Sequence, residues 1–196
     1  MRKRRILALS LLACLLPLTS GIFLLYRYAE TAAGEEVVRR AIRSRSYNTI
    51  KHAAASARVY TILSTVGLPA ASADELAFQF GYFNEWAEAN LPRGRPRDSA
   101  EETYKDLYSN LAGAAVARRL GEIGHASAHS EVRVIGWMMS CGEIPGSADD
   151  GRVPRFPAGS TLRMTIEQFE RDKPQLQETL TTFLATHEQE VLEQAQ

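Results

Sequence analysis

The chain has 196 residues, which is long enough for one ordinary domain and a further segment. Its hydrophobic residues (45%) and charged residues (23%) occur in ordinary proportions, which excludes disordered and collagen-like classes. The formal net charge is zero, whereas nucleic-acid-binding domains are usually strongly basic. We therefore expect no nucleic acid among its partners.

The first 28 residues are typical of a membrane anchor. Four basic residues at positions 2–5 precede residues 6–26, which carry no charge. At 1.5 Å per residue, a helix of about twenty residues spans the roughly 30 Å hydrocarbon core of a bilayer. Basic residues favour the cytoplasmic side, so the sequence predicts a single-pass inner-membrane protein. Its parts are a transmembrane anchor at residues 1–28 and a periplasmic helical domain at residues 29–196.

Two other interpretations of this segment remain open. A cleaved signal peptide has a small-residue cleavage site, and residues 19–21 offer one, although more apolar residues follow. Residues 11–14 resemble a lipobox, which would place a lipid on Cys14. With Cys14 in the membrane, Cys141 is the one thiol outside it, so no disulfide is expected. We expect Cys141 to be buried as a small hydrophobic residue.

Helices are expected to begin directly after the anchor. Residues 30–45 contain good helix formers and would continue the anchor out of the bilayer. Asn48 is the expected N-cap of the next helix, and Gly67 is expected to end it in the left-handed conformation. Four of residues 53–57 are alanine, which leaves room for a neighbouring helix to approach closely.

A second domain helix is expected over residues 70–90, with Asp74 as its cap. An apolar stripe on this helix is expected to face the core. The members of the stripe are Leu76, Phe80, Phe83 and Ala87.

The middle of the chain alternates breaks and helical patterns. Residues 91–97 hold Pro and Gly, which end a helix. Residues 98–101 have the form of a capping box, so a third helix is expected from there to about residue 120. The apolar run at residues 131–139 fits a short strand or a helix, and its context favours helix. Residues 142–160 are rich in Pro and Gly and predict a long loop.

A last helical region begins at residue 161 and is expected to break at Pro174, where Asp172 would cap an amphipathic helix. The sequence thus predicts an all-α fold, with a single N-terminal membrane helix followed by one compact helical-bundle domain. The inward residues expected for the last helix are Leu176, Leu180, Phe183 and Leu184.

Three neighbouring helices each carry a face of small and polar residues. Helical spacing places residues three or four positions apart on one face, so each set points in one direction. These faces are expected to converge on one polar site. The residues concerned are His52 on the first helix, Gly81, Asn84, Glu85 and Glu88 on the second, and Asp106, Asn110 and Gly113 on the third.

The four titratable residues of this set are ligand types for a divalent metal. Helical bundles build metal sites from carboxylates and His that project inward from facing helices. The spacing permits such a site without identifying it, because the chain has no His-Glu-x-x-His motif. A structural hydrogen-bond network and an exposed surface with Trp86 turned inward remain as alternatives. The candidate metal ligands are His52, Glu85, Glu88 and Asp106.

Glycine placement favours a buried site. Gly81 and Gly113 lie inside predicted helices, where each costs about 0.5–1 kcal/mol relative to Ala. Close helix approach would offset that cost. Carboxylates at such a contact are partly buried, so they must be paired, protonated or bound to an ion.

A resemblance to known proteins rests on the same residues. Lys51-His52 is followed by Gly81-x-x-Asn84-Glu85-x-x-Glu88 and then by Asp106-x-x-x-Asn110-x-x-Gly113. This order resembles small bacterial envelope proteins of the VanZ-like and YfiM-like kind, over residues 48–120. In those families the helices span the membrane, whereas the helices expected here are of the soluble type. The resemblance implies an envelope protein with a helical polar site and implies no reaction.

Two other groups of residues are candidates for binding. His125 and His129 are four residues apart, as in helical zinc pairs, but the glycine before them fits a turn equally well. Arg93, Arg95 and Arg97 would suit phosphates or anionic lipid, although charged runs are usually solvated.

Two functions follow from these observations. The first is a membrane-anchored envelope protein whose periplasmic domain binds an envelope protein or a lipid-linked partner through the polar site, a class that includes inhibitors and immunity factors. The second is a metal-dependent hydrolase acting on an envelope substrate. There Glu85 or Glu88 would act as the base, and His52 with Asp106 would hold the ion. We favour the first.

Overall fold

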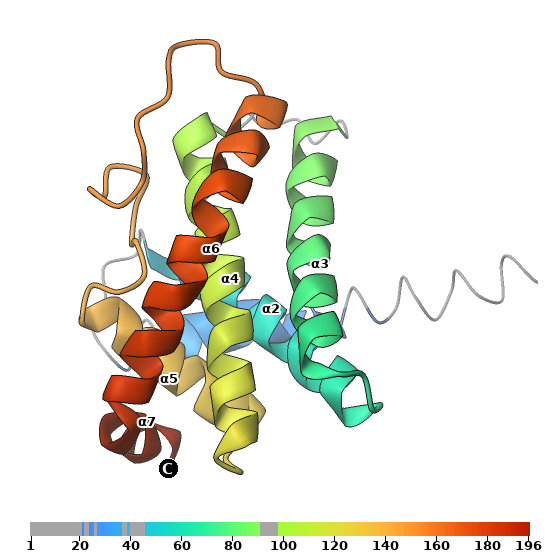
Figure 1. The fold of residues 1–196 in the computed structure, drawn as a ribbon, viewed down its shortest axis with the longest axis vertical. Helices are drawn as coiled ribbons and strands as arrows, with labels where there is room; N and C mark the ends of the chain where they lie inside the picture. Colours follow the sequence, from blue (N-terminus) through green and yellow to red (C-terminus); the bar gives the residue numbers. More distant parts are fainter. Residues whose placement is uncertain (1–20, 22–23, 26, 37–38, 40–45, 91–97) are drawn as a thin grey trace, which may run out of the picture.

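The computed structural model of the chain describes residue 21 and residues 24–25, 27–36, 39, 46–90 and 98–196 (Figure 1). The side chains of residues 88 and 89 are also outside the description. Among the described residues, no helix is long and apolar enough to cross a membrane. Residues 1–20, which hold most of the predicted anchor, lie outside these ranges, so the anchor stays a prediction.

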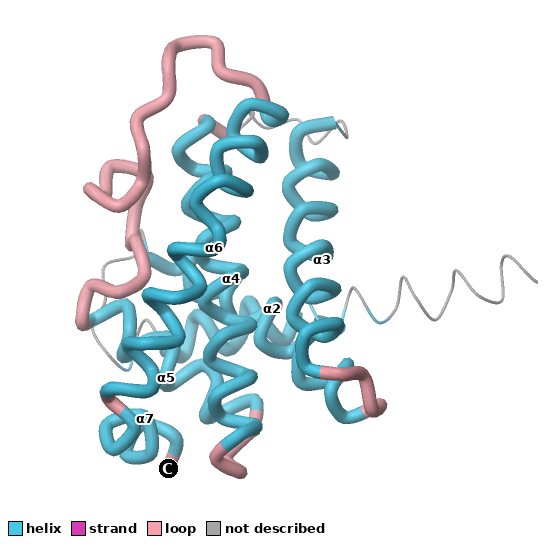
Figure 2. The backbone as a smooth tube through the Cα atoms, viewed as in Figure 1, coloured by secondary structure: helices cyan, strands magenta, loops and turns pink. Residues whose placement is uncertain are grey.

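The described chain consists of helices and loops, with no strand in it (Figure 2). This confirms the predicted all-α fold, including a helix at residues 131–139. Residues 27–36 are helical, and the elements after them are numbered α2 to α7. The bounds are α2 Tyr47–Thr65, α3 Ala70–Asn90, α4 Ala100–Glu122, α5 Ala128–Ser140, α6 Leu162–Thr186 and α7 Glu188–Ala195.

Helix α4 is the centre of the bundle, and it contacts α2, α3, α5 and α6 (Figure 1). Every residue from 103 to 117 is buried, so this helix is covered on all sides. A helix that is buried all round must fill each side with apolar or satisfied polar groups. The largest apolar side chains that α4 buries are Tyr104, Leu107, Tyr108 and Leu120.

Helix α2 approaches α4 closely because both surfaces are made of small residues. Ala53, Ala54 and Ala57 are completely buried. A Cβ atom added to Gly113 would stand 2.0 Å from the carbonyl oxygen of Ala53. Only a residue without a Cβ fits there. The glycine and alanine pattern therefore marks a helix contact.

The predicted apolar stripe of α3 is wrong at Leu76 and Phe83, whereas Ala87 is buried as predicted and Phe80 is partly buried. Leu76 is 47% exposed and Phe83 is 57% exposed. Trp86 is 50% exposed, although the alternative of an exposed polar surface predicted that it faces the core. The buried face of α3 carries Gly81 and Glu85 instead, together with Ala73, Ala77 and Phe78. This helix packs by its small residues, because they allow the shortest distance to α2 and α4.

Several predicted helix ends differ from the observed ones. Helix α2 begins before Asn48, whose side chain donates to Asp106 instead of capping. Asp74 lies inside α3 and pairs with Arg118, with 2.9 Å between Oδ2 and Nη1. Gly67 follows α2 with a φ of 88°, as expected for the residue after a helix end.

Helix α6 continues through Pro174, so the predicted break there is wrong. Phe169 and Leu180 are buried on either side of the proline, and the packing of α6 along α4 outweighs its local cost. Asp172 accepts a hydrogen bond from the hydroxyl of Tyr104 and caps no helix. Cys141, expected to be buried, is exposed because α5 ends there and the loop begins.

Candidate metal centre

Three of the four predicted ligands meet at one point inside the bundle. Atoms of His52, Glu85 and Asp106 all lie within 4.8 Å of one another. The His52 Nδ1 atom is 3.7 Å from Oε1 of Glu85, and its Nε2 atom is 3.6 Å from Oδ2 of Asp106. We refer to these three residues as the acid–imidazole cluster. No other group of three such residues is found in the described part of the chain.

Each residue of the cluster comes from a different helix, and all three are buried. His52 on α2 is 6% exposed, Glu85 on α3 is 2% exposed, and Asp106 on α4 is 1% exposed. The helices can bring these side chains together because their contacts are formed by alanine and glycine. A buried carboxylate costs free energy unless an opposite charge or hydrogen-bond donors compensate it.

Asp106 has two further partners besides His52, one at each carboxylate oxygen. Lys105 Nζ lies 3.3 Å from Asp106 Oδ1 and also contacts the carboxylate of Glu102. The carboxamide of Asn48 donates to Asp106 Oδ2 over 3.2 Å. These contacts orient the carboxylate, in the way that outer partners orient metal ligands in known sites.

Burial is the largest influence on the pKa of Asp106 and on that of Lys105. It raises the pKa of Asp106 to about 7, against the opposing effect of the Lys105 charge. Burial by itself lowers the pKa of Lys105, but the charges of Asp106 and Glu102 outweigh it, so that pKa is raised. The cluster therefore stabilises an added positive charge, whether it is a proton or a metal ion.

The position of the imidazole defines two possible states. A neutral His carries one N–H, so it can donate to only one of two acids that face its two nitrogens. In the first state His52 is protonated and links Glu85 with Asp106 as a structural ion network. In the second, one ring nitrogen and the carboxylates hold a metal ion.

The distances suit a metal ion once the three side chains move closer together. Tetrahedral zinc binds His nitrogen and carboxylate oxygen at about 2.0–2.2 Å, so its ligand atoms lie roughly 3.3–3.6 Å apart. The atoms of the cluster lie within 4.8 Å of one another. Three protein ligands leave at least one position open for water or another group. The donor set therefore suits zinc or a similar divalent ion.

The supporting residues of the sequence pattern surround this cluster. Asn84, Asn110 and Gly81 line a cavity of about 60 Å³ beside His52. A Cβ atom on Gly81 would stand 2.5 Å from Nδ2 of Asn110. That Nδ2 atom is buried with no hydrogen-bond partner among the described residues. The two glycines thus let three helices close around the cluster.

The sequence missed two residues of the site. The sequence predicts Asn48 as a helix cap, and Lys105 is not among the predicted site residues. Both have a sequence signal, because Asn48 lies one helical turn before His52 and Lys105 directly precedes Asp106. The side chain of Glu88, a predicted ligand and candidate base, lies outside the described residues.

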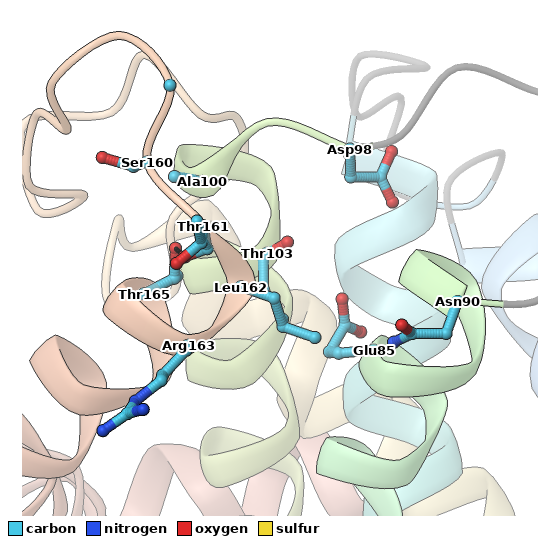
Figure 3. Close-up of a pocket in the computed structure, with 11 residues that line it drawn as sticks. Glu85, Asn90, Asp98, Ala100, Thr103, Ser160, Thr161, Leu162, Arg163 and Thr165 are labelled. Atoms are coloured by element: carbon cyan, nitrogen blue, oxygen red, sulfur yellow. Dashed lines mark hydrogen bonds between the residues drawn. The ribbon is translucent and has the colours of Figure 1, made fainter.

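An open cleft of about 550 Å³ adjoins the cluster, and Glu85 belongs to its wall. The cleft lies between the end of α3, the start of α4 and the start of α6. Figure 3 shows the carboxylate of Glu85 directed into this space, with Asp98 and Thr103 across from it. The Arg163 guanidinium points away and pairs with Glu167. Glu85 therefore connects the cluster to a polar, acid-lined opening.

The other sequence candidates do not form a comparable site. His125 and His129 are both exposed, and His129 Nε2 lies 3.5 Å from Nη1 of Arg133. Neither belongs to a metal-type cluster in the described part of the chain. Arg93, Arg95 and Arg97 lie outside the described residues.

Comparison with known proteins identifies no relative of this chain. No family model matches the chain, and no match is found among curated proteins or solved structures. The resemblance to VanZ-like and YfiM-like envelope proteins therefore rests on the spaced residues alone.

Proposed function

We propose that this chain is a membrane-anchored envelope protein whose periplasmic helical domain binds a partner at a divalent metal centre formed by His52, Glu85 and Asp106. The observation that carries the proposal is the convergence of an imidazole and two carboxylates, from three helices, within 4.8 Å. The partner would enter the cleft that Glu85 lines. The uncharged run at residues 6–26 supports the anchor, and the basic residues before it support the orientation.

The composition of the cleft supports a polar partner. Asp98, Thr103 and Glu85 present oxygen atoms, and the arginine at the rim points away. Such a wall suits the hydroxyl, amide or amino groups of an envelope protein or a lipid-linked saccharide. An anionic group would bind through the metal ion, at the coordination position that the three ligands leave open.

The open coordination position also favours a second candidate, metal-dependent hydrolysis of an envelope substrate. Catalytic zinc sites commonly have three protein ligands and a bound water, whose pKa the metal lowers to about 7. Of the two predicted bases, Glu85 is a ligand here, which leaves Glu88 for the role of base. Activity that is lost in Glu88→Gln while the metal is retained would select hydrolysis over partner binding.

Elemental analysis tests the metal centre. The full chain would be purified in detergent without chelator, and its metal content compared with that of Glu85→Gln. The proposal predicts a stoichiometric divalent ion in the wild type and a strong loss in the variant. Glu167→Gln, at an exposed carboxylate outside the cluster, is the matched control and should keep its metal. A folded wild-type protein that binds no divalent ion would contradict the proposal and leave the structural ion network.

A further inference from the structure

Helix α3 exposes a large apolar surface to solvent. Leu76 is 47% exposed, Phe83 is 57% exposed and Trp86 is 50% exposed. The rings of Phe83 and Trp86 are stacked, with their centroids 6.0 Å apart. Large apolar side chains exposed together on one side of a helix commonly mark a surface that contacts another phase or protein. We call these three residues the outer face of α3.

The outer face lies on a stripe without charge. At 100° per residue, the positions around Leu76 and Phe83 form one side of the helix. The charged Glu75 lies at the edge of this side, and Glu85 lies on the opposite side. The residues of the stripe are Ser72, Leu76, Gln79, Phe80, Phe83, Trp86, Asn90 and Ala87, of which Ala87 is buried.

The apolar N-terminal run ends beside this stripe. Leu25 lines the small cavity at His52 together with Phe80 and Asn84 of α3. Leu24, one residue earlier, is 66% exposed. Residues 6–26 carry no charge, and this run, which the proposed function places in the bilayer, reaches α3 at Leu25. The two apolar surfaces therefore adjoin each other.

We propose that the outer face of α3 rests on the lipid surface of the bilayer that holds the anchor. This proposal depends on the anchor of the proposed function and adds a second membrane contact. Amphipathic helices bind the interface through an apolar face, and Trp is enriched at the depth of the lipid headgroups. A lipid surface fits better than a second protein copy, because the proposed anchor would hold this side of the domain next to a bilayer.

This contact would fix the orientation of the metal centre. Glu85 lies on the side of α3 opposite the outer face, and a helix with its side chains is about 10–12 Å across. The cleft, which Asn90 at the end of α3 helps to line, would then open near the headgroup layer. Partners attached to the membrane would reach it without leaving the bilayer surface.

The two tryptophans of the chain allow a matched test. Trp86 lies on the outer face, whereas Trp137 is partly buried and packs against Phe183 and His187. The full chain would be reconstituted in phosphatidylcholine vesicles whose acyl chains carry bromine, which quenches tryptophan at short range. Trp137→Phe reports on Trp86 alone, and Trp86→Phe reports on Trp137 alone. Circular dichroism would establish that both variants are folded.

The proposal predicts that brominated lipid removes most of the Trp86 emission and leaves that of Trp137 unchanged. If the protein floats with the vesicles but its Trp86 emission is not quenched, the proposed lipid contact is wrong and the proposed anchor stands. Trp86 that is shielded from aqueous acrylamide but not quenched by brominated lipid would identify a protein partner instead, which also overturns it. Chain that fails to float would overturn the anchor and this contact together.

Discussion

The closest helix contact predicts opposite effects for two glycines of the same helix. In Gly113→Ala, the new Cβ would stand 2.0 Å from the carbonyl oxygen of Ala53, which is 1.4 Å short of the 3.4 Å at which ordinary contact begins. The atoms in the way belong to the backbone of Ala53, so no side-chain rotation can relieve the clash. Helix α2 must therefore move away from α4. Gly121, near the end of α4, has no atom within 4 Å of such a Cβ, so Gly121→Ala is the matched control.

The magnitudes follow from two opposing effects. Alanine is favoured over glycine in a helix by about 0.5–1 kcal/mol, and this gain applies to both variants. Overpacking costs typically about 1–3 kcal/mol, and it applies only at Gly113. The free energy of unfolding should therefore be lower in Gly113→Ala than in Gly121→Ala by about 1–3 kcal/mol.

Urea denaturation followed by circular dichroism measures this difference. The contact also has a second readout, because Ala53 follows His52 directly, and a shift of α2 separates His52 from Asp106 on α4. Metal affinity should fall in Gly113→Ala and stay unchanged in Gly121→Ala. Equal stability of the two variants would refute the close contact.

Three further predictions concern the rest of the bundle. Gly81→Ala should destabilise less than Gly113→Ala, because its Cβ meets side-chain atoms of Asn110 and no backbone, and adding Asn110→Ala should restore part of the stability in a double-mutant cycle. Burial raises the pKa of Glu131 above 4.5, so the folded state binds this proton more tightly and stability falls as pH rises from 4.5. Glu131→Gln should make that decline shallower in urea titrations. Ser99→Ala removes the hydroxyl that caps α4 and should cost about 1 kcal/mol, measured by thermal unfolding.

Much of the bundle could be predicted because its helices carry strong local signals. Gly67 after α2, the capping sequence before α4 and the Pro- and Gly-rich residues 142–160 mark boundaries by their backbone preferences. The acid–imidazole cluster was predictable for a similar reason. His52, Glu85 and Asp106 share helix faces with small residues, and small residues mark where helices meet.

The errors arose where a local preference competed with packing. The sequence predicts Leu76 and Phe83 in the core because large apolar residues are usually buried. In α3 the buried face is the one that lets the helix approach α2 and α4 most closely. Glycine and alanine allow that approach, so their side of the helix is buried. Pro174 similarly has a strong local tendency to end a helix, yet α6 continues because residues on both sides of it pack on α4. Neither the buried face of α3 nor the continuation of α6 through Pro174 can be predicted from the sequence of that one helix.

Titration with Co²⁺ tests the metal centre most directly, because this ion gives visible absorption bands when it binds nitrogen and oxygen ligands. The full chain in detergent would be titrated beside His52→Ala and beside His129→Ala, a matched control at an exposed histidine. The account predicts saturation at one equivalent in the wild type and the control, with the bands lost in His52→Ala. Bands that persist in folded His52→Ala, or that are absent from the wild type, would contradict a metal centre at His52, Glu85 and Asp106.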